Sequence, residues 1–208
     1  MGIYVGDKRY ALYVGNTRRK VMNIGLLPDG YVAVDGIMNS TNAYLNTGIN
    51  GLNTISFDIT MSLNESIPNN FECFFGMWPT TSSGNGMQLL LRSNQLYRAE
   101  GRNKFSVSGI STMTNLTVGE KYSFTVTQTE PTSVNNPFYV FARNYGGNAN
   151  TETDKVWIFA LKIYQGGEIV RDYIPCISPN QIVGMYDLVS KSFFSSPNNS
   201  AFVAGNTL

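Results

Sequence analysis

Apolar and polar residues alternate in steps of two over much of the chain, a period that is typical of β-strands with one buried face. The clearest run has Ile55, Phe57, Ile59 and Met61 on one face, separated by polar side chains on the other. Clusters of Asn, Ser, Gly and Pro punctuate such runs, and no longer window has an amphipathic helical stripe with caps. The pattern predicts a chain built from short strands, without helices.

Other segments repeat the pattern and indicate how the strands pair. Residues 88–91 and 96–97 flank a turn at 92–94 and predict a hairpin. Between residues 157 and 164 apolar side chains occupy both faces, which predicts a central strand covered on both sides. Only 14% of the residues are charged, and the abundant Asn, Ser, Thr and Gly suit turns and pleated surfaces. We therefore predict an all-β fold, a two-sheet antiparallel jelly-roll sandwich.

The N-terminal segment contains a short repeat, because Ile3–Lys8 is echoed nine residues later by Leu12–Thr17. Each copy places β-forming residues before Gly-Asp or Gly-Asn, pairs that suit tight hairpin turns. Two copies are too few to bury a core, so we expect this segment to pack against the main domain, another copy or a partner. We divide the chain into a hairpin segment for docking or oligomerisation, residues 1–30, and a main domain, residues 31–208. The side chains expected to dock are Tyr4, Val5, Tyr13 and Val14.

The residue inventory argues against an enzyme. The chain has no histidine, which excludes Ser-His-Asp and Cys-His mechanisms and removes the commonest general base. Glu152 and Asp154 have the spacing of paired carboxylates, but they fall in a turn-rich segment where loop exposure is their expected role. No metal-ligand cluster or phosphate-loop motif is present, so we expect no catalytic residue, metal or cofactor. Whether loop oxygens assemble a calcium site stays open.

Charge and hydropathy limit the partners. A net charge of +1 gives no concentrated positive field for nucleic acid. No apolar run reaches the ~20 residues of a membrane helix, and no secretion signal opens the chain, so synthesis in a cytoplasm is expected. The sequence leaves open whether Cys73 and Cys176 pair. Two buried reduced thiols are the expected state for a chain without a secretion signal.

The C-terminal part carries a succession of recognisable motifs: Asn136–Asn144, Trp157–Tyr164, Gly167–Cys176, Gly184–Val189 and Phe202–Gly205. A further motif, Tyr44–Ile49, lies near the start of the main domain. This succession resembles the concanavalin A-like, laminin G-like jelly-roll domains common in phage and gut-bacterial proteins. The resemblance covers residues 31–205. The N-terminal repeat is similar to hairpin segments that precede such domains in phage structural proteins. Fold alone does not define function, but the resemblance implies the jelly roll and a phage setting.

The function implied by this resemblance is that of a non-enzymatic bacteriophage virion structural protein. It would belong to a fibre, the tail or the capsid surface, and would display a lectin-like domain for carbohydrate or host-surface binding. Expected partners are other virion proteins, through the N-terminal segment, and a cell-surface glycan, with a homo-oligomer, a trimer in particular, as the assembly. Two alternatives stay open: an architectural assembly or decoration subunit without a ligand, and a polysaccharide hydrolase.

Glycan sites in β-sandwiches place an exposed aromatic ring against a sugar face, with amides and carboxylates on the hydroxyls. Trp78 follows a strand and precedes Pro79, a position at a rim. Packing in the core or a loop is the competing interpretation for Trp78, and also for Trp157. The residues expected to bind carbohydrate are Trp78, Tyr97, Asn144, Tyr145, Asn148 and Asn150.

Overall fold

The described part of the chain is an all-β structure. Its secondary structure consists of strands, bridges and turns, and no helix occurs among the described residues, as the alternating pattern predicts. The same residues contain no helix long and apolar enough to cross a bilayer. The computed structural model describes residues 3–5, 8–10, 26–40, 42–79, 86–100, 105–111, 113–132, 135–151 and 155–208.

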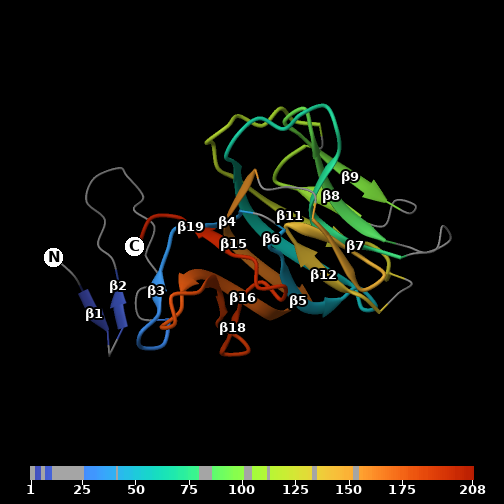
Figure 1. The fold of residues 1–208 in the computed structure, drawn as a ribbon. Helices are drawn as coiled ribbons and strands as arrows, with labels where there is room; N and C mark the ends of the chain where they lie inside the picture. Colours follow the sequence, from blue (N-terminus) through green and yellow to red (C-terminus); the bar gives the residue numbers. More distant parts are fainter. Residues whose placement is uncertain are drawn as a thin grey trace.

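The larger sheet has ten strands, and every strand pair in it is antiparallel. Its centre is the pair β6 and β15, with β11 beside β6 and β16 beside β15 (Figure 1). In order across the sheet the strands are β10 (Phe105–Ser108), β11 (Tyr122–Gln128), β6 (Ile55–Leu63), β15 (Val156–Gln165), β16 (Glu168–Ile177), β17 (Val183–Asp187) and β18 (Ser192–Phe194), with β3 (Val32–Ala33), β4 (Ile37–Asn39) and β19 (Phe202–Ala204) pairing alongside.

The smaller sheet has seven strands and is mixed, because β13 runs parallel to β7. The chain reverses between β12 and β13 at Phe141, whose φ of 64° is rare for a bulky residue and costs ~1–3 kcal/mol. Full burial of the ring and a hydrogen bond from its N–H to the Phe74 carbonyl hold this conformation. The strands are β14 (Asn148–Thr151), β13 (Ala142–Tyr145), β7 (Glu72–Trp78), β12 (Pro137–Val140), β5 (Leu45–Asn50), β8 (Met87–Arg92) and β9 (Gln95–Glu100).

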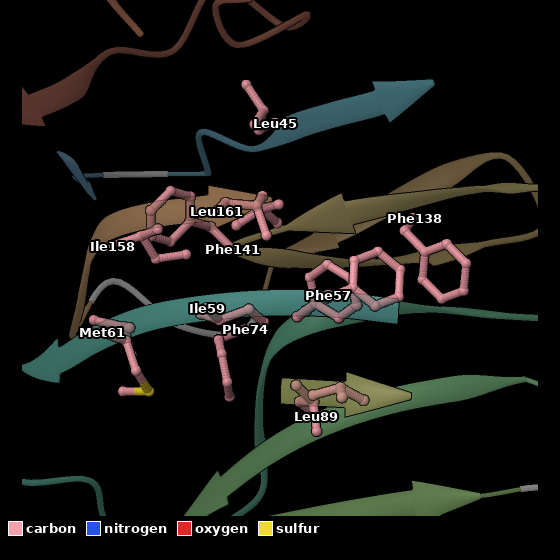
Figure 2. Packing of buried hydrophobic residues seen from close by; sticks show 14 of the residues in the cluster. Leu45, Phe57, Ile59, Met61, Phe74, Leu89, Phe138, Phe141, Ile158 and Leu161 are labelled. Atoms are coloured by element: carbon pink, nitrogen blue, oxygen red, sulfur yellow. The ribbon is translucent and has the colours of Figure 1, made fainter. Parts of the chain in front are cut away.

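One core lies between the sheets, and this makes the domain a β-sandwich (Figure 2). Phe57 from β6 of the larger sheet meets two rings of the smaller one, Phe75 at 4.5 Å and Phe138 at 5.1 Å between centroids. Both contacts are edge-to-face, a favoured geometry for aromatic pairs. Ile59 and Met61 on the same face of β6 are also buried, so the predicted inward face of this strand is confirmed.

Strand β15 departs from the predicted alternation. It is central, since it pairs with β6 and β16, but a register shift between Ile158 and Ala160 changes which residues point inward. Ile158, Leu161 and Ile163 join the core, whereas Trp157 lies on the opposite face and is only partly buried. The strand is therefore central as predicted, but its outer face is covered only in part, because Phe159 is buried there whereas Trp157 is partly open.

The N-terminal repeat is described only in part. Strands β1 (Ile3–Val5) and β2 (Lys8–Tyr10) form an antiparallel pair, as predicted for the first copy. The side chains of Tyr4 and Val5, and the whole of residues 11–25 with Tyr13 and Val14, lie outside the described residues. The cysteines are settled: Cys73 in β7 and Cys176 in β16 belong to different sheets, and both are buried free thiols.

Candidate functional site

Three of the predicted carbohydrate-binding residues come together on the outer face of the seven-stranded sheet. Trp78 and Tyr145 are partners in the parallel ladder of β7 and β13, and Tyr145 faces Asn148 across the β13–β14 hairpin. Met77 points into the core, so its neighbour Trp78 points outward. Tyr145 is 41% exposed. Asn150 lies further along β14 on the same face and is exposed.

Asn144 has a structural role, which corrects its assignment to the glycan site. Its side chain is buried, donates from Nδ2 to the Pro137 carbonyl at 2.8 Å, and accepts at Oδ1 from the Gly147 N–H, also at 2.8 Å. These bonds hold the β13–β14 turn and keep the amide away from solvent. An alternating strand that exposes Tyr145 must bury Asn144.

Tyr97 is separated from the other predicted site residues. It pairs with Leu90 in the β8–β9 hairpin, and Leu90 pairs with Cys73 near the start of β7, whereas Trp78 ends that strand. The Tyr97 ring packs edge-on against Phe71 at 5.4 Å, and its hydroxyl donates to Gln95. The structure thus divides the predicted aromatic set between the two ends of β7.

A cavity of about 340 Å³ lies on the outer face of the other, ten-stranded sheet. We name it the Trp157 cavity after the indole in its wall. Five segments line it: the end of β6, the start of β15, the loop before β11, and the strand connections around residues 35 and 205. Its functional groups belong to Asp35, Asn64, Lys121, Trp157, Phe159 and Asn206.

The aromatic side of this cavity is fixed by contacts to the β6 end. Trp157 Nε1 donates to Asn64 Oδ1 at 3.0 Å, and the Asn64 N–H donates to the Lys155 carbonyl at 2.8 Å. The Lys121 ammonium lies 3.6 Å from the centroid of the Phe159 ring, a cation–π geometry. The indole is therefore held by its nitrogen while part of its surface stays open to the cavity.

The opposite side is built by Asp35 and Asn206. Asp35 Oδ1 accepts from the Asn206 N–H at 3.0 Å, and Oδ2 accepts from the Asn206 amide at 3.4 Å. A Cβ on Gly205 would collide with the Asp35 carboxylate, so a larger residue here would displace that side chain. The pair thus places carboxylate and amide groups in the cavity wall that faces solvent.

A second cavity of about 450 Å³ lies on the same sheet face and is named here the Asp58 cavity. Asp58 Oδ1 accepts from the Thr125 hydroxyl at 2.7 Å, and Oδ2 accepts from the Tyr164 hydroxyl at 2.8 Å. The hydrogen bond to Asp58 raises the pKa of Tyr164 above its usual value. Lys162 pairs with Asp172 at 3.0 Å. The walls of this cavity are thus rich in hydroxyl groups, and its charged groups are paired.

These arrangements suit the binding of a polar, uncharged ligand. The carboxylates of Asp35 and Asp58 already accept hydrogen bonds from protein groups, so neither is presented as an isolated acid or base. Among the described residues no group of three His, Cys, Asp or Glu side chains is placed to hold a metal ion. Glu152 and Asp154 lie outside the described residues.

Comparisons with protein-family models, with curated proteins and with solved structures found no match. The site is therefore defined by its own geometry. Sequence reasoning assigned Trp157 to packing and missed both cavities, although one signal was available. The polar residues Ser56, Asp58 and Thr60 alternate with the core-facing residues of β6, and together they mark an outward face.

Proposed function

We propose that this β-sandwich is a non-enzymatic, jelly-roll carbohydrate-binding module displayed on a bacteriophage particle, and that the Trp157 cavity receives the sugar. The observation that carries the binding proposal is the pairing of a half-open indole with amide, carboxylate and ammonium groups in one cavity. Ligand pockets typically combine apolar surface with a few placed polar groups and span ~300–1,000 Å³.

Sugar chemistry fits these walls. The C–H face of a pyranose ring is apolar and packs on an aromatic surface, which Trp157 supplies. The hydroxyl groups around the ring both donate and accept, and Asn64, Asn206 and Asp35 offer acceptors and donors near that surface. A purely apolar ligand would shut water away from the remaining donors and acceptors of these groups without replacing it, at a cost in free energy.

The phage setting rests on the resemblance of residues 31–205 to phage jelly-roll domains and of the N-terminal repeat to hairpins that precede them. In this proposal the N-terminal segment docks on other virion proteins, and a homotrimer displays the sandwich domains. Mass spectrometry and cryo-electron microscopy of purified particles test it, with the chain expected at a solvent-facing position. A copy packed between subunits, without a free Trp157 cavity, would favour the architectural alternative.

The binding proposal is tested with a glycan array and two matched alanine variants. Wild type is expected to bind at least one glycan, and Trp157→Ala is expected to lower that affinity by about tenfold or more, ~1.4 kcal/mol. Tyr145→Ala is the control, because it removes an exposed aromatic ring from the other sheet. Thermal unfolding of each variant checks that the fold is kept.

The outcomes separate the candidate surfaces. Loss of binding in Tyr145→Ala but not in Trp157→Ala would move the site to the seven-stranded sheet. No glycan bound by wild type would contradict carbohydrate binding altogether. Turnover of a bound polysaccharide that is lost in one Asp→Asn variant would support the hydrolase alternative.

A further inference from the structure

The two cavities lie end to end along β6, along β15, and along β11 with the loop that precedes it. At β6 the Trp157 cavity takes residues 62–64 and the Asp58 cavity takes residues 58–60. At β15 the division falls between Phe159 and Ala160, and on the β11 side between Lys121 and Ser123. On each of these three elements, residues of one cavity are followed within two positions by residues of the other.

The row of residues at the boundary carries only small side chains, and the contact of Lys121 with Phe159 borders this row on the Trp157 side. Ser123, Thr60 and Ala160 are direct partners across β11, β6 and β15, so they form one row across the sheet. The hydroxyls of Thr60 and Ser123 bond each other at 2.9 Å, and Ala160 ends at its methyl group. Core-facing Ile59 and Met61 flank Thr60, which places the row on the outer face. No large side chain in this row separates the cavities.

We propose that the Trp157 cavity and the Asp58 cavity are consecutive subsites of one groove that binds an extended, linear glycan chain. This inference rests on the proposed function and adds the form of the ligand. The stretch from Asp58 in β6 to Asn64, the residue after the strand, spans roughly 20 Å at ~3.3 Å per residue, which is longer than a single sugar ring. The hydroxyl-rich second cavity offers partners for the hydroxyls of further sugar units.

Chain-length dependence tests the groove. The probes are cello-, xylo-, malto- and chitooligosaccharides, each from the disaccharide to the octasaccharide, titrated into the full chain by calorimetry. In the series that binds, affinity is expected to rise about tenfold or more with length, equivalent to ~1.4 kcal/mol, and then to level off. An oligosaccharide that is too short to extend beyond the Trp157 cavity gains no affinity from the Asp58 cavity.

Blocking variants at the boundary sharpen the test. Ala160→Tyr and Ser123→Tyr place a ring in the row from two different strands, and both are expected to reduce the affinity for long chains to that for the disaccharide. Disaccharide affinity is measured for each variant alongside, as the reference for its long-chain affinity. Ser106→Tyr is the control, since Ser106 is exposed on edge strand β10 and lines neither cavity. Unfolding curves confirm that each variant folds.

The results distinguish this inference from the proposed function. Binding that depends on Trp157 but not on chain length, or long-chain affinity that survives both blocking variants, would overturn the groove and leave the single-cavity site standing. Failure of every series to bind wild type, with no other glycan bound on the array, would overturn both.

Discussion

Each sheet carries one of the chain's two tryptophans on its outer face, yet the two indoles have different surroundings. Trp78 ends β7 next to Tyr145, and Gly86 lies so close that a Cβ there would collide with the indole. Trp157 lies within β15, is held through its nitrogen by Asn64, and lines a cavity. The Trp78 indole forms an aromatic surface with Tyr145 across two paired strands, whereas the Trp157 indole forms a wall of a cavity.

The contrast shows what makes a cavity on a sheet face. Walls around Trp157 come from residues 35, 119–121 and 205–206, which are far from it and from one another in sequence. Backbone bonds join these walls to the sheet, from Gly119 to the Leu63 carbonyl and from Gly205 to the Gly36 carbonyl. The immediate sequence neighbours of both tryptophans are apolar, Met77 and Pro79 for one and Val156 and Ile158 for the other, so the difference arises from long-range packing.

A second parallel concerns buried polar side chains that hold hairpins. In the ten-stranded sheet, buried Asp187 accepts hydrogen bonds from the N–H groups of Asp172, Val189 and Ser190. It also lies 3.7 Å from the Arg171 guanidinium. In the seven-stranded sheet, neutral Asn144 does similar work with two bonds. Because Asp187 is charged and accepts hydrogen bonds from more donors, removing its side chain should cost more folding free energy than removing that of Asn144.

The largest expected effect is therefore the difference between Asp187→Ala and Asn144→Ala. We expect Asp187→Ala to lower the free energy of unfolding by about 3–5 kcal/mol, because it leaves three N–H groups and Arg171 without their acceptor. Asn144→Ala is expected to cost about 1–3 kcal/mol. Urea unfolding measures both. Equal losses would show that the charge on Asp187 adds nothing to its hairpin.

The next effect concerns alkaline pH and the thiol of the ten-stranded sheet. Burial raises the pKa of Cys176 from 9.0 to about 12, partly offset by a hydrogen bond from the Tyr186 backbone. The unfolded thiol ionises first, so this contribution to stability is complete below pH 9 and is lost as pH rises toward about 12. The slope is up to about 1.4 kcal/mol per pH unit.

Urea unfolding at a series of pH values measures this slope. Cys176→Ala is the matched variant and should show a shallower decline over the same range. An identical decline in wild type and Cys176→Ala would mean that the thiol ionises equally well in the folded sheet.

The smallest expected effect concerns the asparagines beside the aromatic residues of the two sheets. Asn64→Ala removes the hydrogen bond to Trp157 Nε1 and frees the ring to move, so we expect glycan affinity to fall by about 0.5–1.5 kcal/mol. Asn148→Ala beside Tyr145 is the control and should leave affinity unchanged. Calorimetric titration with the best array glycan provides the measurement. A larger loss in Asn148→Ala would return the site to the β13–β14 hairpin.

The sequence predicts the strands better than the site because strand signals are local. The alternation around Phe57 and the hairpin at residues 92–94 both appear as expected. The bulge at Ile158–Ala160 is invisible in an alternating pattern whose two faces are both apolar, so the sequence does not reveal that Trp157 points away from the core.

The pairing of strands also determines which charged side chains form ion pairs. Adjacent Arg171 and Asp172 suggest a local pair, but neighbours on a strand point to opposite faces. Arg171 instead reaches Asp187 and Asp172 reaches Lys162, each on an adjacent strand. The same limit applies to the cavities, whose polar walls are contributed by segments that sequence alone does not bring together.

The central claim is that sugar binds at Trp157 and not at Trp78. Because the chain has only these two tryptophans, a ¹⁵N-labelled sample gives two indole N–H resonances, assigned with Trp78→Phe and Trp157→Phe. Titration with the best array glycan is expected to shift the Trp157 resonance and leave that of Trp78 in place. A shift confined to Trp78 would contradict the claim and place the binding surface on the seven-stranded sheet.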